Sequence, residues 1–287
     1  MRNPAIYEKR IVAFLDILGF STMVQDSKVD TEMRRKIMKA MKIIRKSGES
    51  EESEYKKVST FSDSAVISYP LHSNSSLFYL LIDVIHLQLM LGTIGVMIRG
   101  GIAIGDCYHD EKIVFGPAMN EAYRLEKKVA LWPRVVIMEK TIEYGITESS
   151  DTDYYSLMYD TEDIMSCLKK DDYDKNNIDH NIYFVDFLRQ PQELTEFGDE
   201  YFDWLRRFRV AIVEGLMRYC KNNNKSSKNK TDIDRVFKKY RWLLNYWNNV
   251  VCDEKAFFPV PNIDLDSKKE FRKKYKDLRI REKYPYY

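Results

Sequence analysis

The segment Arg10–Ser21 reads RIVAFLDILGFS, and it decides the fold. Five consecutive apolar residues, Ile11–Leu15, are typical of a buried strand. That strand runs directly into a carboxylate, Asp16, and a turn at Gly19 follows. A strand that ends in this way predicts a polar site at the edge of a sheet.

The segments that follow alternate between helix and strand patterns. Met33, Ile37, Met41 and Ile44 form one apolar helix stripe. The remaining segments are a hairpin (55–61 and 64–70), a helix (77–91), a strand (96–105), a helix (116–130) and two strands (134–138 and 181–188). This order predicts an α+β fold of the ferredoxin-like (split βαβ) kind, with an antiparallel sheet covered by helices on one side.

Two further features concern the organisation of the chain. After residue 190 two long helical patterns predict a C-terminal helical hairpin with a basic and aromatic tail, so we expect domains at 1–190 and 191–287. The apolar run 75–98 is long enough for a membrane span, but Asp83, His86 and Gln88 interrupt it. We therefore expect a buried helix and no membrane contact.

Composition excludes several classes of protein. Lys plus Arg (46) nearly equals Asp plus Glu (44) in 287 residues, so charge does not indicate a nucleic-acid partner. The four cysteines form no C-x-x-C pair and the four histidines are scattered, which favours reduced thiols over a zinc site. The N-terminus has no signal-peptide core. These features predict a cytoplasmic protein.

Asp16 and Asp63 are candidate metal ligands. The first strand and the hairpin are neighbours in a ferredoxin-like sheet, so both carboxylates can meet at one edge. Their mutual repulsion would be relieved by Mg²⁺ or Mn²⁺, and Gly19 would let turn amides approach a phosphate. The alternative for each aspartate alone is structural, as a helix cap or an ordinary turn residue.

The stretch NEAYR places Asn120 and Arg124 four residues apart on one face of a helix. Arginine can neutralise a phosphate in a transition state, and asparagine can orient a ribose oxygen. The alternative is a solvated helix face, since Glu121 and other charged residues are nearby.

Four motifs carry a resemblance to a known family in their order and spacing: FLDILGFS, TFSDSAVIS, RGGIAIG and NEAYRLE. Over about residues 8–140 the sequence resembles the catalytic domain of class III nucleotidyl cyclases. The resemblance implies two divalent cations per site, Mn²⁺ or Mg²⁺, bound by Asp16, Asp63 and the Ile17 carbonyl. It also implies that Phe20 and Ser21 lie against the triphosphate.

The same resemblance implies a head-to-tail homodimer with shared sites. Asn120 and Arg124 of one chain would act as the transition-state pair beside the metal aspartates of the other chain.

Several positions depart from the family pattern. Ser59 and Ile113 stand where purine cyclases place the polar and acidic residues that read the base, so they become candidate substrate contacts of a different pocket. Ser62 replaces a common glycine, and Asp106 stands where some members place a phosphate-binding arginine. Arg99 is a candidate substitute for that arginine, and the alternative is a structural role.

A non-purine pocket with a helical C-terminal extension is most similar to the bacterial Pycsar anti-phage pyrimidine cyclases. The resemblance implies conversion of UTP to 3′,5′-cyclic UMP and pyrophosphate, with a separate effector activated by the product. Uridylate is preferred because most members of the group make it. The alternatives are a cytidylate cyclase, a purine cyclase and a catalytically degenerate nucleotide-binding signalling module. A palm polymerase or primase is disfavoured by NEAYR and by the absence of a basic stripe.

Overall fold

The computed structural model describes residues 6–48, 55–72, 75–110, 112–149, 154–171, 181–189, 198–220 and 227–254. The chain divides into two compact units, Met1–Ala211 and Ile212–Tyr287. The expected domain boundary at residue 190 stays a prediction. The basic and aromatic tail at 267–287 lies outside the described residues.

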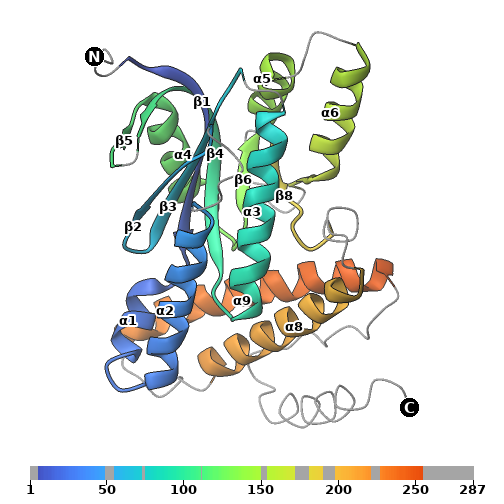
Figure 1. Cartoon of the computed structure of the whole chain (residues 1–287). Helices are drawn as coiled ribbons and strands as arrows, with labels where there is room; N and C mark the ends of the chain where they lie inside the picture. The colour runs from blue at the N-terminus through green and yellow to red at the C-terminus, as the bar shows by residue number, and fades with distance from the viewer. Residues whose placement is uncertain are drawn as a thin grey trace. The chain divides into compact units, whose positions relative to one another are not determined.

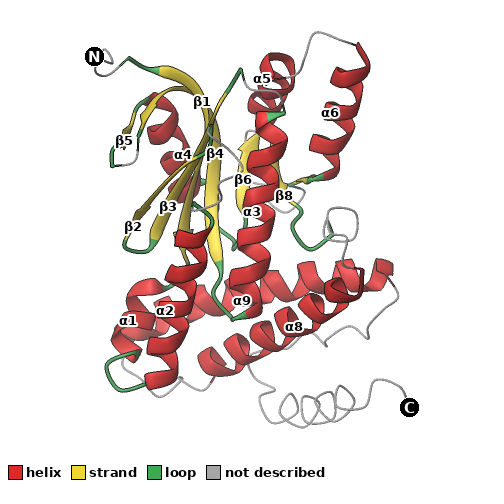
Figure 2. Ribbon diagram, in the orientation of Figure 1, coloured by secondary structure: helices red, strands yellow, loops and turns green. Residues whose placement is uncertain are grey.

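The first unit is built on an eight-stranded sheet (Figures 1 and 2). Its strands follow the order β2-β3-β1-β4-β6-β8-β7, and β5 pairs with β4. The strand bounds are β1 Glu8–Ile17, β2 Lys57–Phe61, β3 Ser64–Pro70, β4 Ile98–His109, β5 Val114–Phe115, β6 Val135–Met138, β7 Leu168–Lys170 and β8 Ile182–Val185. The apolar segment of β1 is buried, as its sequence predicts, and it lies in the interior of the sheet between β3 and β4.

The predicted ferredoxin-like core is confirmed. Strands β4, β1, β3 and β2 are neighbours in that order, and each adjacent pair is antiparallel. The helices α1 (Phe20–Asp26) and α2 (Thr31–Lys46) connect β1 to β2, and α3 (Ser76–Thr93) connects β3 to β4. Beyond this core β6 pairs with β4 in parallel, so the complete sheet is mixed rather than antiparallel throughout.

Helices cover both faces of the sheet, which corrects the expectation of a one-sided cover. Side chains alternate along β1, so Leu15 and Phe14 point to opposite faces. Leu15 shares its face with residues of α2 and α3, whereas Phe14 packs beneath α4 (Pro117–Lys128). The close approach of α4 depends on Gly101, since a Cβ there would lie 2.4 Å from the carbonyl oxygen of Ala122.

The apolar run that resembles a membrane span forms α3. Within the described part of the chain, α3 is the one helix long and apolar enough to cross a membrane, and 61% of its apolar window is buried inside the fold. It packs against the sheet beside β1 and β3. Its composition therefore matches that of a core helix, as expected.

Four elements complete the first unit and were not predicted: α5 (Glu139–Ser149), α6 (Tyr154–Ser166), β5 and β7. The two helical patterns near the C-terminus form α8 (Gly198–Cys220) and α9 (Ser227–Glu254). The unit boundary falls within α8, and in the second unit the C-terminal part of α8 packs closely against α9, because a Cβ on Gly215 would lie 2.2 Å from the ring of Tyr240. The predicted helical extension is confirmed.

Candidate active site

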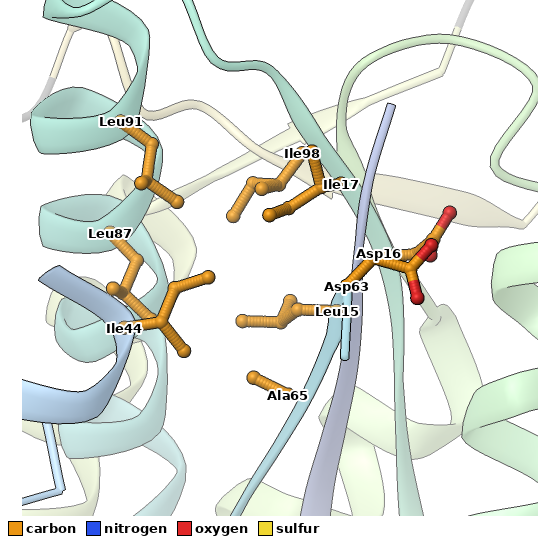
Figure 3. Close-up of a pocket in the computed structure, with 9 residues that line it drawn as sticks. All are labelled: Leu15, Asp16, Ile17, Ile44, Asp63, Ala65, Leu87, Leu91 and Ile98. Atoms are coloured by element: carbon orange, nitrogen blue, oxygen red, sulfur yellow. The ribbon is translucent and has the colours of Figure 1, made fainter. Parts of the chain in front are cut away.

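The fold brings Asp16 and Asp63 together. Asp16 is the penultimate residue of β1, and Asp63 lies in the turn between β2 and β3. The Ile17 amide donates a hydrogen bond of 3.0 Å to the Asp63 carbonyl, which fixes the turn against the end of β1. Both carboxylates point to the same side of the sheet (Figure 3). The predicted adjacency of the two aspartates is therefore present in this fold.

The pocket at this edge is not itself the polar site. Apolar side chains from α2 and α3, which include Ile44, Leu87 and Leu91, line one side of it. Figure 3 shows the two carboxylates directed away from these side chains, on the other side of the strand. The aspartates therefore face the side of the sheet that carries α4.

The electrostatics of Asp16 fit a cation site. Burial raises the pKa of the Asp16 carboxyl; the nearby Arg99 opposes this effect, and the Asp63 charge reinforces it. The Asp16 side chain keeps 22% of its surface exposed, so an ion can reach it. Two adjacent carboxylates suit Mg²⁺ or Mn²⁺, which commonly binds to one or two protein carboxylates together with substrate phosphates. Within the described ranges no cluster of three or more His, Cys, Asp or Glu side chains is placed to bind a metal.

Arg99 links Asp16 to α4. Its Nη2 lies 3.6 Å from Asp16 Oδ2 and 2.5 Å from Glu126 Oε1. Glu126 belongs to α4, and its side chain is only 4% exposed. A buried carboxylate therefore holds Arg99 beside the candidate metal ligand. Glu126 was not identified from the sequence, because its role depends on the face of the sheet that α4 covers.

Gly19 lies in the turn that its sequence predicts, and the helix α1, which was not predicted, follows it directly. Gly19 adopts a left-handed conformation (φ 75°) as the N-cap, and no side chain caps the helix. Phe20 and Ser21 are the first two residues of α1. Phe20 is half-buried and Ser21 is exposed. Asp16 lies in a strand, so it is not the cap of this helix.

Asn120 and Arg124 lie on the exposed side of α4. The opposite side of this helix, which includes Ala118 and Ala122, is buried against the sheet. Arg124 binds Glu121 through two hydrogen bonds of 2.7 Å. Its side chain is 44% exposed, as the solvated-face alternative would also require. The assignment of the pair to catalysis stays a prediction.

The two candidate base contacts lie near one histidine. Ser59 is 7% exposed, and its Oγ is 3.0 Å from His109 Nε2. Ile113 is 53% exposed and precedes Val114, which pairs with His109 in the ribbon of β4 and β5. His109 was not identified from the sequence, because no local pattern indicates that the end of β4 reaches β2.

Asp106 lies away from the carboxylate pair. It pairs in register with Lys9 of β1, and their side chains form an ion pair of 3.0 Å. Lys9 and Asp16 point to opposite faces because they lie seven positions apart on β1. Among the charged residues of β4 it is therefore Arg99, not Asp106, that lies beside Asp16.

Comparison with protein-family models and with curated proteins finds no match. Among solved structures the chain is similar to the adenylyl cyclase CyaB from P. aeruginosa, with 17% identity, 63% of this chain and 94% of that chain covered, and a TM-score of 0.40. It is also similar to a bacterial light-regulated adenylyl cyclase, with 12% identity, coverage of 72% and 100%, and a TM-score of 0.41. A third is the non-canonical dimeric guanylyl cyclase domain of the RhoGC fusion protein from the aquatic fungus Blastocladiella emersonii, with 17% identity, coverage of 62% and 94%, and a TM-score of 0.38.

At these identities and TM-scores the likeness assigns neither a family nor a substrate to this chain. The fold class rests on the strand order and the helix connections described above.

Proposed function

We propose that this protein is a nucleotidyl cyclase that converts UTP to 3′,5′-cyclic UMP and pyrophosphate. The ribose 3′-oxygen forms a bond to the α-phosphorus, the bond from that phosphorus to the pyrophosphate oxygen breaks, and the hydroxyl proton passes to water. The observation that supports this proposal most is the convergence of Asp16 and Asp63 on one side of the sheet.

The residues at this edge have distinct proposed roles. Asp16 and Asp63, with the Ile17 carbonyl, would hold two divalent cations, Mn²⁺ or Mg²⁺. Such ions would supply Lewis-acid activation of the 3′-hydroxyl and charge neutralisation for the leaving pyrophosphate. Phe20 and Ser21, which directly follow the turn at Gly19, would lie against the triphosphate.

Asn120 and Arg124 would act in a second chain. Their exposed position on α4 suits a role in a partner's site better than a role beneath their own helix. We propose a head-to-tail homodimer in which each chain supplies the metal aspartates to one site and the Asn120–Arg124 pair to the other. Arg124 would leave Glu121 and neutralise charge on the α-phosphate in the transition state.

The proposed context is a cytoplasmic anti-phage signalling system of the Pycsar kind. Cyclic UMP would be a second messenger that activates a separate effector, with no nucleic-acid or membrane partner. This proposal is supported by the non-purine residues Ser59 and Ile113 at the candidate base contacts and by the helical extension.

The first test compares product formation by the wild type and two aspartate variants. With Mn²⁺ and UTP, we expect cyclic UMP from the wild type and none from Asp16→Asn or Asp63→Asn, with circular dichroism confirming that both variants fold. Asp203→Asn, in an exposed ion pair on α8, is the matched control and should keep wild-type activity. Near-normal turnover by either site variant would refute the metal assignment.

A second test asks whether the sites are shared. Asp63→Ala and Arg124→Ala should each be inactive alone, because each removes one half of every site. An equimolar mixture should recover about one quarter of wild-type activity, since half of the dimers then carry one intact site. A mixture as inactive as its components would refute the shared-site proposal.

A further inference from the structure

A continuous chain of buried polar side chains crosses the face of the sheet that carries Asp16. Arg10 Nε donates to Ser68 Oγ at 2.8 Å, Ser68 Oγ lies 2.7 Å from His109 Nδ1, and His109 Nε2 lies 3.0 Å from Ser59 Oγ. None of the four residues is more than 8% exposed. Polar groups buried to this degree depend on one another for hydrogen bonds.

The strand register explains how the four residues meet. Ser68 pairs with Val12, and Ser59 pairs with Val66, so both serines point to the face of the sheet that packs beneath α4. His109 ends β4, and its imidazole reaches both serines, one through each ring nitrogen. The imidazole therefore bridges two strands, β2 and β3. Ser59, on the edge strand β2, is the last side chain in this row of hydrogen-bonded residues.

His109 carries a single ring proton near neutral pH. Burial, reinforced by the Arg10 guanidinium, lowers the pKa of His109 to about 4, and the Asp110 charge opposes this effect only partly. A neutral imidazole donates from one nitrogen and accepts at the other. The nitrogen that holds the proton decides the direction of the hydrogen bond to Ser59.

The Arg10 guanidinium fixes that direction. Because arginine only donates, Ser68 Oγ accepts from Arg10 Nε and has its own proton to place. Within the described residues His109 Nδ1 is the acceptor at hydrogen-bond distance from that hydroxyl. The opposite arrangement would leave the proton of a fully buried hydroxyl without an acceptor, at a cost of about 1–3 kcal/mol. His109 therefore accepts at Nδ1 and donates from Nε2 to Ser59.

Ser59 is thus left with a proton to donate to a group other than His109, since its oxygen already accepts from His109. We propose that His109 is a positioning residue that makes Ser59 a hydrogen-bond donor toward the base, so that the site selects a carbonyl-bearing base, uracil over cytosine. This inference rests on the proposed function, in which Ser59 contacts the base. Uracil presents a carbonyl acceptor at the position where cytosine presents an amino donor.

The energetic consequence is a measurable base preference. If a cytosine amino group faced the Ser59 hydroxyl, both groups would be donors and neither would have an acceptor. Such a mismatch costs about 1–3 kcal/mol. We therefore expect kcat/KM for UTP to exceed that for CTP by at least about tenfold.

The first arm of the test reads the tautomer directly. Nitrogen-15 NMR of the full-length protein, labelled at its four histidines, reports which ring nitrogen of His109 carries the proton, and His109→Gln assigns its resonances. We expect a neutral ring protonated at Nε2. A ring protonated at Nδ1 would overturn the inference, whether or not the protein has cyclase activity.

The second arm measures the ratio of kcat/KM for UTP to that for CTP. Ser59→Ala should bring this ratio close to one, whereas Thr60→Ala, an exposed neighbour on the other face of β2, should leave it unchanged. A wild-type ratio in Ser59→Ala, or equal use of CTP by the wild type, would overturn the inference.

The two proposals fail differently. Absence of a cyclic product from every nucleotide would refute the proposed function. Equilibrium dialysis would then decide the inference, since equal binding of UTP and CTP would overturn it. A cyclic product from GTP alone would be consistent with a hydrogen-bond donor at Ser59, because guanine also bears a carbonyl. It would overturn the assignment of a pyrimidine substrate.

Discussion

Mild acidification is expected to destabilise the folded chain through one buried histidine. The pKa of His109 falls to about 4 in the fold, against an ordinary value near 6.5 in the unfolded chain. Between these two values the unfolded state binds a proton that the folded state excludes, so stability is complete above the unfolded pKa and is lost as the pH falls toward 4. The full effect is about 3 kcal/mol, and about 2 kcal/mol of it is expected by pH 5.

The assay is urea unfolding of the wild type and His109→Gln at pH 7.5 and pH 5.0. Glutamine does not titrate, so the difference between the two proteins isolates His109 from other groups. Such groups include Asp16, whose raised pKa acts in the opposite direction, and His86, whose pKa burial lowers. The wild type should lose about 2 kcal/mol more than the variant on acidification. Equal losses would refute the buried neutral imidazole and the polar chain built on it.

Three further predictions concern the carboxylate pair and α4. In the absence of metal, Asp16→Asn should raise the melting temperature by a few degrees, because burial and Asp63 both oppose the charged form of Asp16. In calorimetry, Mn²⁺ should stabilise the wild type and not this variant. The reverse pattern would contradict a cation site. Gly101→Ala should lower the free energy of unfolding by about 3 kcal/mol, because its Cβ would meet the backbone of α4; a change below about 0.5 kcal/mol in chemical denaturation would contradict the close approach. Glu126→Gln should lower the free energy of unfolding by a similar ~3 kcal/mol. It should also weaken Mn²⁺ binding in titration calorimetry, since Arg99 would then have Asp16 as its carboxylate partner. Unchanged affinity for Mn²⁺ would show that Arg99 does not compete with the ion.

The central part of the fold could be predicted from local patterns. The apolar segment of β1 and the turn at Asp63 are both legible in the sequence, and the βαββαβ order places them side by side. The adjacency of Asp16 and Asp63 follows from that order alone. Their role as metal ligands is a chemical argument, and it stays a prediction.

The other parts of the fold and of the candidate site depend on contacts between distant segments, which no local sequence pattern indicates. The position of α4 on the second face of the sheet depends on small residues on two elements, Gly101 and Ala122, which meet only once the register is fixed. β5 has only two residues, too few for a periodic signal. The pairing of His109 with Ser59 joins residues 50 positions apart, across the end of a long strand.

Cyclase activity is tested by incubating the purified protein with Mn²⁺ and each of ATP, GTP, CTP and UTP, and identifying the products by mass. We expect cyclic UMP from UTP, little or no cyclic product from the other nucleotides, and none from Asp16→Asn. Failure of the folded wild type to form a cyclic monophosphate from any of the four nucleotides would refute the proposed cyclase function.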